Sequence, residues 1–168
     1  SLARQGNATN GHLAYARTLI ASVPQPIRDS AHDLVGARAI SLLLLVSEDP
    51  DARDVQARLL ESQLDHATGT ELNRLHKSIQ KLVHGAPEIR LLLADLVMPA
   101  LARMDETDSR KYLTIIQGMI EADGRRDRFE WLFGRLLRGH FSALMNGDRG
   151  SVKANRTLSM LEDDVRTV

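Results

Sequence analysis

Two segments of this chain are apolar around almost their whole circumference, and this feature constrains the fold more than any other. They cover Leu34 to Val46, with the run AISLLLLVS, and Ile89 to Leu101, with the run LLLADLVMPAL. A helix without a polar face belongs in the middle of a helical bundle. The longest uncharged apolar stretch, Ala39 to Ser47, is far shorter than the roughly 20 residues that cross a bilayer. We therefore expect a soluble chain with two central helices and no transmembrane segment.

The rest of the sequence also has helical periodicity and no long alternation of apolar and polar residues. Aromatic residues make up 4% of the 168 residues and hydrophobic residues 43%. The core must therefore consist mainly of aliphatic side chains, which suit packed helices. The sequence predicts an all-α fold, a single orthogonal bundle of about eight helices without a sheet. Residues 1–145 form the bundle domain, and residues 146–168 form a loop and a weak terminal helix that packs on it.

Capping residues indicate where several helices begin. Asp49 before Pro50 is typical of an N-cap followed by the first helical position. Thr68 and Glu71 have the spacing of a capping box. Acidic residues from Asp105 onward favour the positive end of the next helix.

Apolar spacing predicts which helix faces are buried. A first helix over Gly11 to Ala21 has Leu13 and Leu19 on one face, and the helix after Pro50 buries Ala52, Val55 and Leu59. A later helix buries five residues on one face, and the last long helix carries an unbroken stripe of eight. These are Tyr112, Ile115, Ile116, Met119 and Ile120, and then Phe129, Leu132, Phe133, Leu136, Leu137, His140, Phe141 and Leu144.

The overall charge argues against nucleic acid as a partner. There are 22 basic and 22 acidic residues, so the formal net charge is zero. Long-range attraction to nucleic acid or anionic lipid is then weak, and few aromatic side chains are available to stack on bases. Cysteine is absent, which excludes disulfides and thiolate metal sites.

No motif in the sequence indicates catalysis or a bound cofactor. No Gly-x-Ser-x-Gly, phosphate-binding loop or His-Glu-x-x-His motif occurs, and no two histidines have the spacing that places two ligands on one helix face. We therefore expect no catalytic residue and no cofactor, and we interpret the histidine of the last stripe as a core residue. The six histidines are His12, His32, His66, His76, His84 and His140.

The segment EADGRRDRFE offers the sharpest candidate for a metal site. With Gly124 at the sixth position of an EF-hand loop, Glu121, Asp123, Asp127 and Glu130 take ligand positions. The first position would be a methionine, which cannot supply the expected carboxylate. A turn explains the same residues more simply, because Gly124 can end one helix and Asp127 with Glu130 can cap the next. We favour the turn and keep the metal site as the alternative.

The order of segments resembles a known extension domain. The segments are VPQPIRDSAHD (Val23–Asp33), GARAISLLLLVSEDPDARDVQARLL (Gly36–Leu60), IRLLLADLVMPALARM (Ile89–Met104) and YLTIIQGMIEADGRRDRFEWLFGRLLRGHF (Tyr112–Phe141). Over roughly Gly11 to Phe141 they resemble the C-terminal extension that follows the protease domain in bacterial HtpX-like membrane zinc metallopeptidases. The Ala-Asp-Gly turn is also similar to that of TerB-like helical domains.

The resemblance implies a parent protein that hydrolyses peptide bonds with zinc. The zinc ligands and general base of that family lie in the protease domain, and no residue here matches them. It also implies a parent in the inner membrane with this domain in the cytoplasm. Because the chain starts at Ser1, we expect it to be a piece of a longer protein.

Three classes of function follow from these patterns. The leading hypothesis is a non-catalytic accessory domain of a zinc-dependent metalloendopeptidase that serves docking, regulation or assembly, with its own protease domain or a substrate polypeptide as the partner. The alternative is a TerB-like, metal-responsive binding module centred on Asp123 to Glu130. An independent enzyme would need convergent carboxylates and histidines in a cleft.

Overall fold

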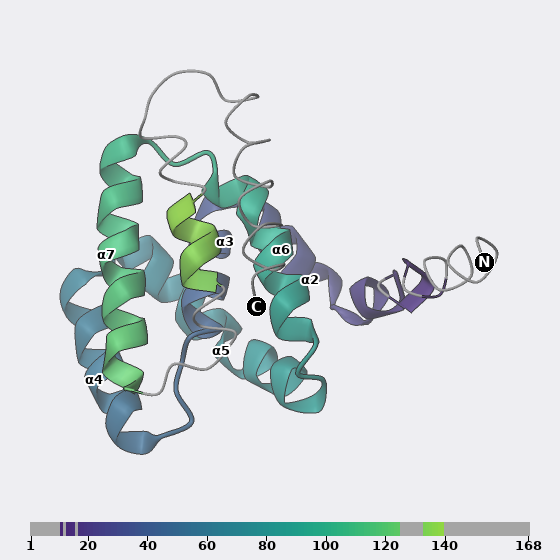
Figure 1. Ribbon diagram of the computed structural model, residues 1–168, viewed down its shortest axis with the longest axis horizontal. Helices are drawn as coiled ribbons and strands as arrows, with labels where there is room; N and C mark the ends of the chain where they lie inside the picture. The colour runs from purple at the N-terminus through teal and green to yellow at the C-terminus, as the bar shows by residue number, and fades with distance from the viewer. Residues whose placement is uncertain (1–10, 12, 16, 125–132, 140–168) are drawn as a thin grey trace, which may run out of the picture.

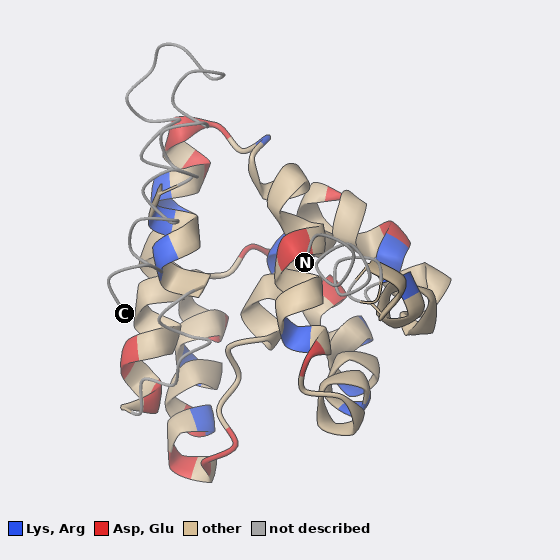
Figure 2. Cartoon of the chain, turned by 45° about the vertical axis from the view of Figure 1, so that its right-hand side comes forward, with Lys and Arg blue, Asp and Glu red and all other residues tan. Residues whose placement is uncertain are grey.

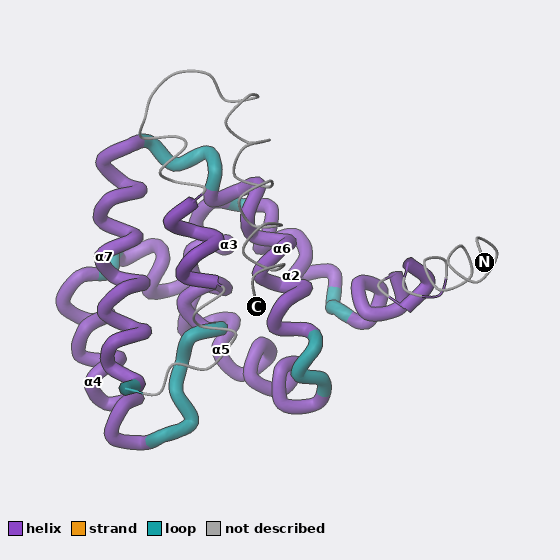
Figure 3. Tube along the Cα trace, viewed as in Figure 1, coloured by secondary structure: helices purple, strands orange, loops and turns teal. Residues whose placement is uncertain are grey.

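The chain folds as an all-α bundle, as the sequence predicts. The computed structural model describes residues 11, 13–15, 17–124 and 133–139, and no strand occurs among them (Figure 3). Its helices are α2 (Gln25–His32), α3 (Leu34–Leu43), α4 (Pro50–Gln63), α5 (His66–Gly85), α6 (Ile89–Leu101) and α7 (Glu106–Asp123). The described residues up to 22 and residues 133–139 are also helical. The predicted segment 146–168 lies outside the described residues.

Helix α3 occupies the centre of the bundle, as its apolar circumference predicts. It packs against α2, α5 and α6 (Figure 1). The side chain of Ile40 is 0% exposed, and Leu93 of α6 is equally inaccessible. The helix ends at Leu43, three residues before the predicted Val46, because the chain turns there toward α4.

Helices α4 and α7 pack against each other, and one predicted burial on α4 is wrong. All five predicted core residues of α7 are buried. On α4, however, Val55 is 51% exposed, whereas the neighbouring Gln56 is 1% exposed. The inward face of α4 therefore keeps the predicted Ala52 and half-buried Leu59 but includes Gln56 in place of Val55, and Gln56 is held there by the hydrogen bonds that it makes.

Two of the three predicted helix starts are confirmed. Asp49 and Asp105 are N-caps whose side chains accept hydrogen bonds from the first turn of their helices. The Thr68 capping box is wrong, because α5 begins three residues earlier. Asp65 is its N-cap and accepts from the Thr68 backbone N–H at 3.0 Å. Aspartate is at least as good an N-cap as threonine, so the earlier residue takes this position.

The N-terminal helical residues extend away from the bundle (Figure 1). Leu19 packs against the core, but Leu13 is 53% exposed and Tyr15 is 55% exposed. The predicted apolar face is therefore covered only at the end that joins the bundle at Val23.

The last helix is described over residues 133–139 only. Phe133 and Leu137 are buried there, in agreement with the predicted stripe, and Leu136 is half-buried. The other predicted members lie outside the described residues, namely Phe129, Leu132, His140, Phe141 and Leu144.

Candidate functional site

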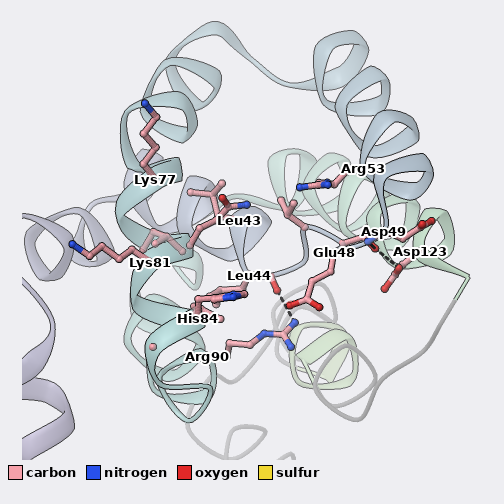
Figure 4. Close-up of a pocket in the computed structure, with 16 residues that line it drawn as sticks. Leu43, Leu44, Glu48, Asp49, Arg53, Lys77, Lys81, His84, Arg90 and Asp123 are labelled. Carbon is pink, nitrogen blue, oxygen red and sulfur yellow. Dashed lines mark hydrogen bonds between the residues drawn. The ribbon is translucent and has the colours of Figure 1, made fainter.

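An open groove between α5 and the loop that joins α3 to α4 is the candidate site (Figure 4). Its volume is about 1140 Å³. Residues from four separate parts of the chain line it, and they combine an apolar floor with charged walls. The apolar ones are Leu43, Leu44, Val46, Ile79 and Val83, and the charged or titratable ones are Glu48, Asp49, Arg53, Lys77, Lys81, His84, Arg90 and Asp123.

The loop at the floor of the groove is held by side chains that satisfy its backbone. Beyond the end of α3, the carbonyls of Leu44 and Leu45 no longer have helical partners. The Arg90 guanidinium donates to the Leu44 carbonyl at 2.8 Å. The Gln56 amide nitrogen donates to the Leu45 carbonyl at 2.9 Å and to the Met119 carbonyl at 2.9 Å. The loop is therefore anchored to α6, α4 and α7 at once.

Ser47 completes this anchoring. Its backbone N–H donates to the Gln56 side-chain oxygen at 2.9 Å, and its hydroxyl donates to Asp123 at 2.5 Å. The same hydroxyl accepts from the Asp49 backbone N–H at 3.1 Å. One serine thus links the groove loop to the N-terminus of α4 and to the C-terminus of α7.

The structure describes two of the four candidate metal ligands, and their carboxylates accept hydrogen bonds from different partners. Glu121 is exposed and accepts from the Gln117 amide at 2.8 Å, whereas Asp123 accepts from the Ser47 hydroxyl. Asp127 and Glu130 lie outside the described residues. Gly124 has a φ of 63°, in the left-handed region, so the predicted helix-ending glycine is confirmed. Among the residues that the structure describes, no three histidines or carboxylates gather around a common point.

The hydroxyl and the histidine of the groove are not paired as a nucleophile and base would be. Ser47 is the only hydroxyl-bearing residue among the described lining residues, and it donates to Asp123. Of the described histidines, only His84 lines the groove. The geometry here provides hydrogen bonds that fix the loop at the floor of the groove.

A second polar cluster joins α2 to α5 outside the groove. Arg74 donates to both carboxylate oxygens of Glu71, at 2.5 and 2.8 Å, and to the Ser30 hydroxyl at 3.0 Å. Ser30 in turn donates to Glu71 at 3.0 Å. The bonds from Arg74 lower the pKa of Glu71 against the opposing effect of burial, and Glu71 raises the pKa of Arg74. This cluster has the character of a structural ion pair.

Two further titratable groups are held by packing. Burial raises the pKa of Tyr112, whose hydroxyl is hydrogen-bonded to Ser41 in the core. Burial also acts to raise the pKa of Asp65, but hydrogen bonds from Thr68 and the charge of Arg38 outweigh it and lower that pKa. Both groups hold helices in place and lie outside the groove wall.

Sequence reasoning missed Gln56, Ser47 and Arg90, which build the loop. Gln56 lies four residues after Ala52 and so shares its predicted inward face, which was the one sign in the sequence that it is buried. Hydropathy alone places a glutamine on the surface.

Charged side chains of both signs are dispersed over the bundle (Figure 2). None of the helices in the described ranges is both long enough and apolar enough to cross a membrane. Comparisons with models of protein families, with curated proteins and with solved structures find no match.

Proposed function

We propose that this chain is a non-catalytic accessory domain that docks a polypeptide segment in the groove beside α5. The observation that carries the proposal is the anchored loop, held through Arg90, Gln56 and Ser47. Because the loop is fixed before a ligand arrives, binding loses little conformational entropy. The apolar floor supplies buried area, and the charged walls supply orientation.

The larger protein that this domain serves is a zinc-dependent metalloendopeptidase. The segment order that resembles HtpX-like peptidases supports this part of the proposal. Zinc would then be bound by residues outside this chain, and the docked polypeptide would be the protease domain itself or its substrate. The parent would lie in the inner membrane, with this domain in the cytoplasm.

The docking role is tested with the isolated chain and fluorescently labelled, unfolded casein. We expect a rise in fluorescence anisotropy and no cleavage of the casein. Cleavage that stops with a chelator would contradict a non-catalytic role. Absence of any anisotropy change at millimolar chain would contradict docking.

A matched pair of valine variants locates the binding surface. Val46 lines the groove and is half-buried, whereas Val55 lies outside it and is exposed. We expect Val46→Asp to weaken casein binding by about tenfold, because it places a charge on the apolar floor. Val55→Asp should leave binding unchanged, and circular dichroism verifies that both variants are folded. Equal binding by the two variants would place the docking surface elsewhere.

The second candidate is a TerB-like, metal-responsive module at the turn after α7. The left-handed Gly124 and the carboxylate of Asp123 support it. A calcium ion would have to compete with Ser47 for that carboxylate. Calorimetric titration with calcium tests it, and absence of heat at millimolar metal rules it out.

A further inference from the structure

The carboxylates on the wall of the groove are already engaged within the protein. Asp49 accepts from the Ala52 backbone N–H at 3.1 Å as an N-cap. Asp123 accepts from the Ser47 hydroxyl at 2.5 Å. The side chains of Glu48 and Arg90 point toward one another across the lower end of the groove (Figure 4). Each carboxylate of the groove therefore has a polar or cationic neighbour within the protein, and the bonds to Asp49 and Asp123 come from neutral donors that leave their negative charge in place.

Four basic side chains of the groove, other than Arg90, have no partner of this kind. Lys77, Lys81 and His84 lie on α5, and Arg53 lies on α4 across the groove. Within the described ranges, none of these four makes an ion pair or a side-chain hydrogen bond. Residues four apart on a helix are neighbours, so Lys77 and Lys81 repel each other when no anion is present. The lining carries four cationic side chains (Arg53, Lys77, Lys81 and Arg90) against three carboxylates, so a small positive excess remains, and the cations without a partner lie on α4 and α5.

The lysine side chains have the length to reach a ligand above the floor. In the structure their stems line the groove, while their ammonium groups point outward, away from Leu43 and Leu44 (Figure 4). A lysine keeps its charge in water while its methylene groups cover apolar surface. A ligand with apolar groups on the floor would thus place its carboxylates beside the lysine ammonium groups.

We infer that the segment docked in this groove is an acidic polypeptide, one that combines carboxylate side chains with aliphatic ones. This inference rests on the proposed docking function and names the chemistry of the partner. An apolar floor with a few cations at its rim suits such a segment better than nucleic acid, which requires a continuous basic track and aromatic platforms. Anionic lipid is the other source of negative charge, and the experiment separates it.

The test is a titration of the isotopically labelled chain with a short, flexible peptide of leucine, glutamate and serine, followed by NMR chemical shifts. We expect shifts at the described groove residues. A peptide with lysine in place of glutamate, and one with serine in place of leucine, should each bind more weakly by about fivefold or more. Added salt should weaken binding of the acidic peptide, because these charges are exposed.

Charge reversal on the groove wall supplies the matched variants. Lys81→Glu should weaken binding of the acidic peptide by about fivefold. Lys111→Glu, an exposed lysine of α7 outside the groove, should leave binding unchanged. Equal binding by the two variants would overturn the inference.

The outcomes distinguish this inference from the docking function. If the lysine-containing peptide binds the groove as well as the acidic one, the acidic preference is wrong and docking survives. If no peptide at millimolar concentration changes the chemical shifts of the groove residues, both the docking function and the acidic preference are wrong. The chain could instead sediment with vesicles that contain phosphatidylserine, lose this sedimentation in the Lys81→Glu variant, and bind no peptide. The ligand would then be a lipid surface, and the inference would be overturned.

Discussion

Gln56 is the most informative residue to change, because one buried side chain satisfies three backbone groups. It donates to the carbonyls of Leu45 and Met119 and accepts from the Ser47 N–H, each at 2.9 Å. We consider Gln56→Leu, which approximately keeps the size of the side chain and removes every hydrogen bond. Packing should change little, so the loss in the free energy of unfolding measures the contribution of the hydrogen bonds.

The expected loss follows from the number of groups that lose their partner. A buried donor or acceptor without a hydrogen bond costs about 1–3 kcal/mol. Gln56 is 1% exposed, so water does not reach these groups without movement of α4 or the loop. The Leu45 carbonyl and the Ser47 N–H lose their partner, whereas the Met119 carbonyl stays within α7, so we expect a loss of at least about 2 kcal/mol in the free energy of unfolding. That is a large part of the 5–15 kcal/mol that is typical of a whole domain.

Urea denaturation followed by circular dichroism measures this loss. The matched control is Gln63→Leu, because Gln63 is exposed at the end of the same helix, and a change within about 0.5 kcal/mol is expected. A Gln56→Leu variant within about 1 kcal/mol of the native chain would refute the reasoning. It would mean that these backbone groups find other partners.

Three other changes test the packing and the electrostatics. Leu43→Ala removes a buried side chain at the end of α3, and urea denaturation should show a loss of about 2–5 kcal/mol. Gly36→Ala places a methyl carbon 2.1 Å from the backbone oxygen of Ser30, so α2 and α3 must move apart, and a thermal melt should show a loss of about 2 kcal/mol or more. The lowered pKa of Glu71 means that its bonds stabilise the fold above the ordinary glutamate pKa of about 4.3 and lose this effect as the pH falls through the lowered value. Glu71→Gln should therefore lower stability at neutral pH by about 0.5–1 kcal/mol and bring the two proteins closer together in acid, as measured by urea midpoints across pH.

Exposed residues provide the controls for these three changes. Leu91→Ala alters a leucine that is 49% exposed and should cost less than Leu43→Ala. Gly85→Ala has open space around the added carbon and should be nearly neutral. Glu106→Gln removes an exposed partner of Arg110 and should change stability little at any pH. If a control matches its core counterpart, the burial argument for that site is wrong.

Hydropathy predicts the burial of α3 well, but it overestimates the burial of α6, where Leu91 is 49% exposed. Leu42 in α3 and Val97 in α6 have no alternative to burial, and both lie in the core. Helix α4 is different, because its apolar content is low and does not decide which face turns inward. Gln56 is inside because its amide donates both to the Leu45 carbonyl of the loop and to the Met119 carbonyl of α7, and this meeting depends on the tertiary arrangement.

The candidate site was harder to predict than the core for the same reason. The groove joins residues of α5, such as Lys81, to Asp123 and to the loop at Ser47, which are far apart in the sequence. Local patterns indicated that Asp123 belongs to a turn, and they contained no information about its bond to Ser47. Pairings of this kind require the positions of α3, α5 and α7 to be known first.

The exchange of a single amide proton, that of the Ser47 backbone N–H, reports the opening of the groove loop. This N–H lies in a loop, where amide protons usually exchange with water through small local openings. Here the Ser47 N–H donates to the buried side-chain oxygen of Gln56, and the amide nitrogen of the same side chain donates to the Met119 carbonyl of α7. The Ser47 amide proton is freed when the loop moves away from Gln56, so its exchange in heavy water should be much slower than that of an ordinary loop amide.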